Sequence, residues 1–249
     1  DAGKSGIGVY MRQLVAGLAE RVGPENIVLY GSDDDIAAVG ASGCVIKKSL
    51  RFWAKPLFNL IWHLFILPVR LIFSGADILF LPAANRRSIW FSPIPAVGVV
   101  HDFSQLHIPA KYDRFRMLYV LRLLPFLIRR LDAIISVSET TRVDLINYVK
   151  AAPERITVVY NGLDHTRFFP NTIPNRQIIE TEFGIRRPYL LYAARLEHPG
   201  KNHINLLRAF RLLIDEADPG LDLVLIGKPA EGHEYVLSEI DQLKINDRV

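Results

Sequence analysis

Short, continuously apolar runs alternate along the chain with stretches in which apolar residues recur every three to four positions. The apolar runs are typical of strands that are covered on both faces. They are NIVLYG (26–31), DILFLP (77–82), AVGVVHD (96–102), DAIISVS (132–138) and RITVVYNG (155–162). The helical spacing predicts a helix over 8–22 and further helices over 54–73, 113–130 and 139–150. This alternation indicates βαβ units, and therefore an α/β fold with a parallel sheet.

The stretch 165–188 interrupts the alternation, because it carries three prolines and no long apolar run. After it, the pattern predicts strand 189–194, helix 202–215, strand 221–226 and helix 231–244. We therefore expect a first domain over 1–170, a linker over 171–188 and the beginning of a second domain over 189–249. Two strands are few for a doubly wound domain, and no strand precedes the first helix, so we expect a fragment truncated at both ends.

Charge is concentrated in the first half of the chain. Residues 47–130 hold 13 basic and 3 acidic residues, whereas the whole chain has a net charge of +4. A basic segment rich in apolar residues favours an anionic membrane surface or a phosphorylated ligand as partner. Nucleic acid is not expected, because zinc-ligand spacing, aromatic RNA-binding motifs and Arg/Lys-rich tracts are all missing from the sequence.

The most apolar segment is PLFNLIWHLFILPVRLIF (56–73), which approaches the ~20 residues needed to span a bilayer. Four residues argue against spanning, namely Asn59, His63, Pro68 and Arg70. A buried or interfacial helix is therefore the preferred interpretation. The single cysteine, Cys44, excludes an intramolecular disulfide and suits a reducing compartment.

Two short motifs in the first half could contribute to a binding site. Gly6 and Gly8 precede the first predicted helix, where they either let a phosphate approach the backbone or form a plain tight turn. His101 and Asp102 end a buried strand, the edge where α/β sheets bind ligands. The histidine could transfer a proton or donate a hydrogen bond, or it could have only a structural role. A metal would need further ligands, and only His107 is near in sequence, so no metal site is predicted.

The segment YLLYAARLEHPGKNHINLLRAF (189–210) places Arg195 at the end of a strand and Lys201 at the start of a helix. The helix dipole disfavours a cation at this end unless an anion is bound. Arginine offers a fork for phosphate oxygens and lysine a point charge, so the pair suits a phosphate group. The alternative is a solvated pair of surface cations. Elsewhere, Asn161-Gly162 predicts a turn after strand 155–162.

Five motifs occur here in the order seen in one enzyme family: GIGVY, VHD, SVSE, VVYNGLD and AARLEHPGKN. In them the chain resembles retaining glycosyltransferases of the GT-B fold, family 4 (glycosyltransferase group 1), and their mannosyltransferase-like branch. The resemblance implies two Rossmann-like domains with parallel sheets, of which the C-terminal one is incomplete here. It assigns the acceptor to the N-terminal domain and the nucleotide sugar to the C-terminal domain. It also implies transfer of a sugar, mannose or a similar hexose, from a nucleotide sugar to a saccharide or lipid-linked acceptor with retention of configuration.

The same resemblance assigns roles to individual residues. Gly6 and Gly8 correspond to the loop that approaches the donor diphosphate, Arg195 and Lys201 to the pair that holds it, and His101 to the catalytic histidine beside the transferred sugar. It implies no metal and no cofactor, GDP-mannose as a donor, and a cytoplasmic enzyme at the membrane face. The acidic motif of the family, two glutamates eight residues apart, is expected beyond Val249. Glu231 and Glu239 share the spacing, but they follow strand 221–226 too closely.

Two other functions fit parts of the sequence. A non-catalytic GT-B relative could bind an anionic membrane surface or a partner through its basic first half. A phosphohydrolase could use His101 and Asp102 with a metal ion, and chelators would then stop phosphate release.

Overall fold

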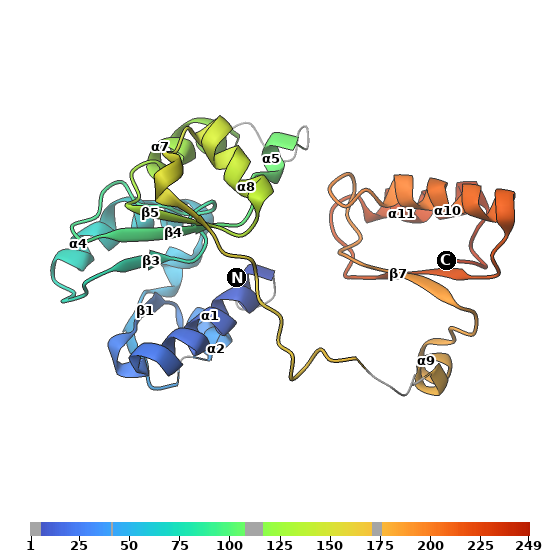
Figure 1. Cartoon of the computed structure of the whole chain (residues 1–249), viewed down its shortest axis with the longest axis horizontal. Helices are drawn as coiled ribbons and strands as arrows, with labels where there is room; N and C mark the ends of the chain where they lie inside the picture. Colours follow the sequence, from blue (N-terminus) through green and yellow to red (C-terminus); the bar gives the residue numbers. More distant parts are fainter. Residues whose placement is uncertain (1–5, 41, 108–116, 171–175) are drawn as a thin grey trace. The chain divides into compact units, whose positions relative to one another are not determined.

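A computed structural model describes residues 6–40, 42–107, 117–170 and 176–249. These residues form two compact units, of which the first ends at Leu163 and the second begins at Asp164 (Figure 1). The boundary falls within the motif VVYNGLD (158–164), between its last two residues and shortly after the last strand of the first unit. The assignment of the acceptor to the first unit and of the nucleotide sugar to the second stays a prediction.

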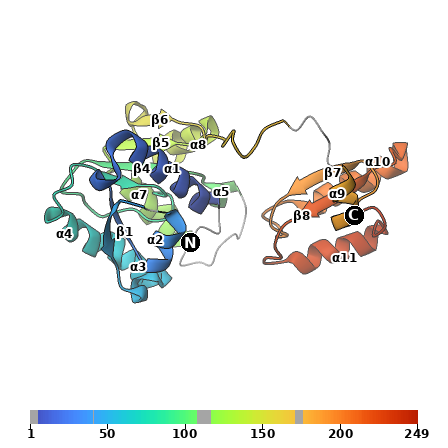
Figure 2. The same cartoon turned by 90° about the horizontal axis from the view of Figure 1, so that it is seen from below.

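The first unit is built on parallel strands. Its main sheet has four strands in chain order, β3 (Leu79–Leu81), β4 (Ala96–Val100), β5 (Ala133–Ser136) and β6 (Ile156–Val158). A separate parallel pair consists of β1 (Val28–Gly31) and β2 (Val45–Lys48). The second unit adds another parallel pair, β7 (Tyr189–Ala193) and β8 (Asp222–Ile226) (Figure 2). The predicted α/β fold with parallel sheets is confirmed.

The helices of the first unit follow the predicted periodicity. Predicted helix 54–73 is formed without a break by α3 (Pro56–Ile61), the π-helical η3 (Trp62–Ile66) and α4 (Leu67–Ile72). The remaining helices with an apolar face are α1 (Gly6–Val22), η4 (Tyr119–Leu123), α7 (Leu124–Ile128), α8 (Glu139–Asp144) and η5 (Leu145–Val149). Residues 113–116 of predicted helix 113–130 lie outside the described part. No helix among the described residues combines the length and apolarity that crossing a membrane requires.

Three local predictions need correction. The helix α2 (Asp33–Val39) and the strand β2 were not predicted; α2 has no apolar stripe and is held instead by a capping box between Ser32 and Asp35. No turn forms at Asn161–Gly162; the chain turns a few residues later, where the carboxylate of Asp164 accepts hydrogen bonds from the amide and hydroxyl of Thr166. This carboxylate cap stabilises the turn at the later position. The position of the glycines in α1 is corrected below.

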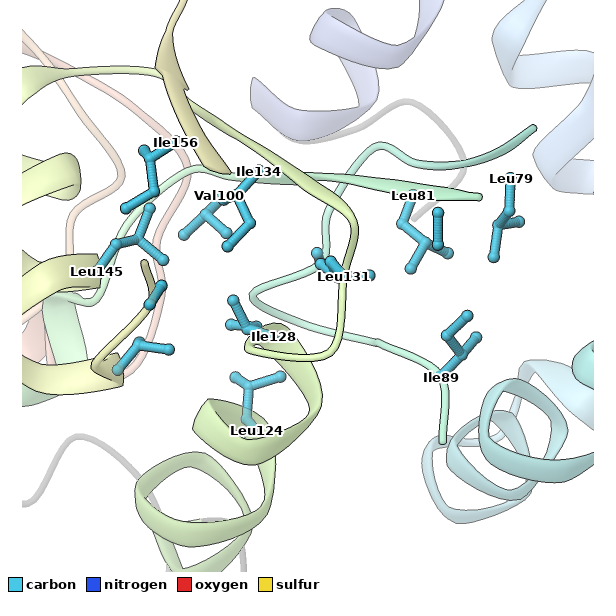
Figure 3. Packing of buried hydrophobic residues seen from close by; sticks show 14 of the residues in the cluster. Leu79, Leu81, Ile89, Val100, Leu124, Ile128, Leu131, Ile134, Leu145 and Ile156 are labelled. Carbon is cyan, nitrogen blue, oxygen red and sulfur yellow. The ribbon is translucent and has the colours of Figure 1, made fainter. Parts of the chain in front are cut away.

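The core of the first unit lies between the main sheet and the helices around it. Leu124 and Ile128 of α7 face Leu131, Ile134 and the end of β4 (Figure 3). Leu124 and Ile128 are fully buried. This packing fixes the carboxyl ends of β4 and β5, and therefore the loops that follow these strands.

The second unit has its own smaller core. Its helices are α9 (Arg176–Phe183), α10 (His203–Ala217) and α11 (His233–Leu243), and α10 and α11 lie on the same side of β7 (Figure 1). The buried residues of this core are Leu207, Phe210, Leu223, Val236, Ile240 and Ile245. The pairing of β7 with β8 places the ends of both strands, at Ala193 and Ile226, side by side.

Candidate functional site

His101 lies at the carboxyl end of β4, as predicted, and its position is fixed by two contacts. Its Nε2 atom lies 2.8 Å from the carbonyl oxygen of Pro82, and the hydroxyl of Thr141 donates to the carbonyl oxygen of His101 at 3.1 Å. Because a carbonyl can only accept, Nε2 carries a proton in this arrangement. In the neutral ring, Nδ1 is therefore the basic atom.

The surroundings of His101 keep the ring neutral. Burial lowers the pKa of His101 below its usual 6.5, and the charge of Arg86 lowers it further. The hydrogen bond to Pro82 and the nearby charge of Asp102 act in the opposite direction without reversing the shift. At neutral pH the side chain can therefore accept a hydrogen bond or a proton through Nδ1.

The predicted glycine motif lies next to His101, although not where the sequence placed it. The helix α1 begins at Gly6, so Gly6 and Gly8 belong to its first turn rather than preceding it. The first amides of a helix have no acceptor within the helix and can bind an anion. Two residues later, the ring of Tyr10 meets the ring of His101 edge to face, with ring centroids 4.8 Å apart. The structure thus brings the first turn of α1 to the end of β4.

A glycine is not needed at position 6 for packing. A Cβ atom added to Gly6 would meet no other atom within 4 Å. The fold therefore gives no reason for glycine there, whereas a ligand that lies against the backbone would give one. Gly8 is buried, so the lack of a packing reason for glycine applies to Gly6 alone.

Asn85 is a further residue of this edge that the sequence did not single out. Its side-chain amide donates to the carbonyl oxygen of Asp102 at 3.1 Å, and its Oδ1 atom is buried without a hydrogen-bond partner among the described residues. The polar run Asn85-Arg86-Arg87, which begins four residues after the end of β3, was a usable signal, because it follows a strand at the ligand-binding edge.

Asp102 has a local structural role. Its carboxylate accepts from the amide and hydroxyl of Ser104, at 3.1 and 2.6 Å, and so caps the short helix α5 (Ser104–His107). Across the described part of the chain, no three His, Cys, Asp or Glu residues are grouped so that they could hold a metal ion.

In the second unit, Arg195 and Lys201 lie at the two ends of one turn between β7 and α10. The guanidinium of Arg195 is 2.6 Å from the carboxylate of Glu197, and its side chain is largely exposed. Lys201 is exposed and is followed by Asn202, which has a left-handed backbone (φ 55°) and gives α10 no side-chain cap. No acidic residue occupies the first turn of α10. The start of this helix therefore combines uncapped amides with the exposed cation Lys201, the arrangement that an anion would stabilise. Arg195 lies at the other end of the turn, where Glu197 is its partner among the described residues.

Two side chains contact carbonyl oxygens of the turn between β7 and α10 and stabilise it. The hydroxyl of Tyr192 donates to the carbonyl oxygen of Lys201 at 2.8 Å, and Nδ1 of the buried His203 lies 3.3 Å from the carbonyl oxygen of Glu197. The rings of Tyr192 and His203 meet at 5.2 Å. Neither residue was singled out from the sequence, because Tyr192 has the pattern of a strand residue and His203 that of a helix residue.

Main-chain hydrogen bonds fix the other side of the turn. The amide of Leu196 donates to Lys228 at 3.1 Å, and the amide of Ala230 donates to Leu196 at 2.9 Å. The path of the chain on both sides of Arg195 is thereby set by the segment that follows β8. The positions of the two cations depend on this pairing.

Glu239, one of the two glutamates with eight-residue spacing, is engaged in the second unit. Its carboxylate accepts from the guanidinium of Arg208 on α10 at 2.6 Å. This ion pair joins α10 to α11 and gives Glu239 a structural role.

Residues 4–167 match a family described as Glycosyltransferase Family 4, and this match covers more than half of the chain. The chain belongs to this family. The predicted resemblance to family 4 glycosyltransferases is thus confirmed at the level of the family. No curated protein matches the chain.

Solved glycosyltransferase structures share the fold of this family 4 chain. The crystal structure of Anabaena Alr3699/HepE in complex with UDP is 16% identical, with a TM-score of 0.66 over 98% of this chain and 65% of that chain. The same protein with UDP-glucose gives 17% identity and a TM-score of 0.65, over 99% of this chain and 65% of that one. WaaG, a glycosyltransferase involved in lipopolysaccharide biosynthesis, gives 15% identity and a TM-score of 0.59, over 97% and 64%. The chain therefore has the predicted GT-B fold and spans about two thirds of the length of these proteins.

Proposed function

We propose that this chain acts in a retaining hexosyltransferase, which moves mannose or a similar hexose from a nucleotide sugar to a saccharide or lipid-linked acceptor. GDP-mannose is the donor we expect from the mannosyltransferase-like motif LEHPGKNH. Membership of family 4 supports sugar transfer, and the structures of HepE with UDP and with UDP-glucose support a nucleotide-sugar donor in a related fold. We place the reaction in the cytoplasm, at an anionic membrane surface, with no nucleic-acid partner.

The observation that carries this proposal is the turn between Arg195 and Lys201. Breaking a sugar–phosphate bond develops negative charge on the departing diphosphate. Fixed cations and helix amides aimed at that charge stabilise the transition state more than the ground state. Because two cations and the start of α10 already supply positive charge, we propose that the diphosphate is bound here without a metal ion or other cofactor.

In the first unit, we assign Gly6 and Gly8 to the approach of a donor diphosphate and His101 to the transferred sugar. The neutral ring of His101 presents Nδ1 as an acceptor, while its protonated Nε2 is held by Pro82. The ring can therefore accept a hydrogen bond from a sugar hydroxyl but is not positioned as a free cation. Asn85, with its unpaired buried oxygen, is a second acceptor for hydroxyl groups at this edge.

Calorimetric titration of the 249-residue chain with GDP, UDP, GDP-mannose and UDP-glucose tests the donor site. We expect binding that persists in EDTA and that weakens roughly 10- to 100-fold in Arg195→Ala and in Lys201→Ala, as the loss of a charge-assisted hydrogen bond predicts. Arg211→Ala is the matched control, because Arg211 lies within α10, ten residues beyond Lys201, and pairs with Asp215 as Arg195 pairs with Glu197. Equal affinity in all three variants would remove the turn from the donor site.

A transfer assay with the gene product that carries this sequence tests the reaction. The expected product keeps the anomeric configuration of the donor, which NMR of the product identifies directly. Loss of Arg195 or Lys201 should lower turnover by orders of magnitude. An inverted product would refute retention while leaving sugar transfer intact.

The second candidate is a non-catalytic relative that binds an anionic membrane or a partner. It is favoured by the basic, partly exposed apolar surface of the first unit. Vesicle binding without any nucleotide or nucleotide-sugar binding would support it over the enzyme.

A further inference from the structure

The helix from Pro56 to Ile72 has a second apolar face that no described residue of its own unit covers. The inward face is buried through Trp62, Leu64, Leu67 and Leu71. On the outward side, apolar residues recur every four positions and are exposed. They are Leu57 (65% exposed), Ile61 (36%), Phe65 (54%), Val69 (51%) and Phe73 (83%), and are called the outer stripe below.

The outer stripe departs from the usual pattern of a surface helix, whose outward face is polar. Of the three polar side chains on this helix, two make hydrogen-bond contacts within the protein. The side-chain oxygen of Asn59 accepts from Arg87 at 2.9 Å, and the ring of His63 lies 2.7 Å from the carbonyl oxygen of Asn59. Only Arg70 remains exposed, at one end of the stripe.

The helix geometry keeps the outer stripe on one side. In an α-helix, residues four apart drift around the axis, because one turn holds only 3.6 residues. The π-helical turn η3, from Trp62 to Ile66, holds more residues per turn and reduces this drift in the middle of the helix. Figure 2 shows the helix from α3 to α4 along one flank of the unit.

The residues around the outer stripe are basic, which favours an anionic partner. Residues 36–76 contain five basic residues and no acidic residue. Lys48 and Arg51 are paired with Asp33 and Asp34. Lys55, which precedes the stripe, and Arg70, which lies in sequence between Val69 and Phe73, form no ion pair within the described part of the chain and are exposed.

We infer that the outer stripe is the surface that lies on an anionic phospholipid bilayer, with Lys55 and Arg70 against the lipid phosphates. An amphipathic helix of this kind rests in the headgroup region and does not cross the membrane. A second copy of the chain fits less well, because pairing two stripes in either direction would set a cation of one against a cation of the other. The inference deepens the membrane association proposed above but does not depend on catalysis.

The test is co-sedimentation of the 249-residue chain with sucrose-loaded vesicles, without donor or acceptor. Vesicles of phosphatidylcholine containing phosphatidylglycerol should bind the chain, vesicles of phosphatidylcholine alone should bind it far less, and high salt should release it. Phe65→Asp should lower the bound fraction at least about tenfold, as the loss of one buried phenylalanine predicts. Phe183→Asp, at an exposed position (69%) on α9 in the second unit, is the matched control and should bind as the parent chain does.

Several results would overturn the inference. They are no binding to the anionic vesicles, binding that Phe65→Asp does not weaken, and equal losses in the two aspartate variants. Self-association that Phe65→Asp abolishes, without vesicle binding, would assign the stripe to a second copy. If the gene product that carries this sequence does not bind vesicles although the 249-residue chain does, another segment covers the stripe. Because nucleotide-sugar binding is measured separately, failure here leaves the proposed donor site standing.

Discussion

Replacing Gly227 by alanine should displace Arg195 by pushing on its backbone, while leaving its side chain unchanged. Gly227 directly follows β8, and a Cβ atom there would overlap the carbonyl oxygen of Ala194 and lie 2.6 Å from its carbonyl carbon and 3.0 Å from the Cα of Arg195. Carbon atoms in contact lie at about 3.5 Å, so relief requires the backbone to move by about 1 Å. These neighbours are main-chain atoms and cannot rotate away as a side chain could.

The expected cost has two parts. Overpacking of this kind destabilises a protein by roughly 1–3 kcal/mol, which thermal unfolding of the second unit should show. If Arg195 holds a diphosphate, its displacement should also weaken GDP or UDP binding by roughly 10- to 100-fold, the loss of one charge-assisted hydrogen bond. Calorimetric titration at a temperature where the variant is folded measures the second effect separately from the first.

A double variant separates the two explanations. In an Arg195→Ala background, Gly227→Ala should cost no further affinity, because the group that it displaces is already missing. Gly17→Ala is a control for the substitution itself: Gly17 lies inside α1 with no atom within 4 Å of an added Cβ, so alanine should stabilise by about 0.5–1 kcal/mol and leave affinity unchanged. Wild-type stability and affinity in Gly227→Ala would refute the reasoning about the strand end.

Three further predictions can be tested with single variants. Burial lowers the pKa of His63 from its usual 6.5 to about 4, so at mildly acidic pH the unfolded chain binds a proton that the native chain excludes. The free energy of unfolding, measured by urea titration, should therefore fall by about 2 kcal/mol between pH 7.5 and 5. His63→Gln should lose this pH dependence. Gly6→Ala should melt as the parent chain does but bind GDP about tenfold more weakly, and equal affinity would exclude a close ligand. Leu124→Ala should lower the free energy of unfolding by about 2–5 kcal/mol, whereas the exposed Leu118→Ala should change it by less than about 0.5 kcal/mol.

The fold could be predicted where burial is visible in the sequence, either as a continuous apolar run or as apolar residues at helical spacing. The strands β4 and β5 are continuously apolar because helices and neighbouring strands cover them, and this pattern was sufficient to find them. The elements α2 and β2 leave no such trace. The helix α2 depends on the cap at Ser32, and β2 is exposed along its length and is placed only by its pairing with β1. Such elements are decided by local capping and by tertiary pairing, which periodicity does not report.

The candidate site follows the same division. Arg195 and Lys201 could be found because the strand, the turn and the helix that position them are all visible in the pattern. Glu197, Tyr192 and His203 could not, because their role comes from contacts with the backbone of the turn rather than from a residue type at a fixed spacing. Tyr10 reaches His101 across more than ninety positions of sequence, a contact that only the folded chain defines.

The helix from Pro56 to Ile72 shows why sequence alone could not choose between a buried and an interfacial helix. Both of its faces are apolar, so hydrophobicity cannot say which one packs inward. The choice is made by contacts outside the helix: Arg87 holds Asn59, and Trp62 contacts Tyr30, which together turn the polar side chains and one apolar face toward the protein. Once that face is buried, the other must meet either water or a partner. Because Lys55 and Arg70 lie beside this face and no acid lies between residues 36 and 76, the partner that reduces both the apolar exposure and the charge repulsion is an anionic apolar surface. A lipid bilayer combines these two properties.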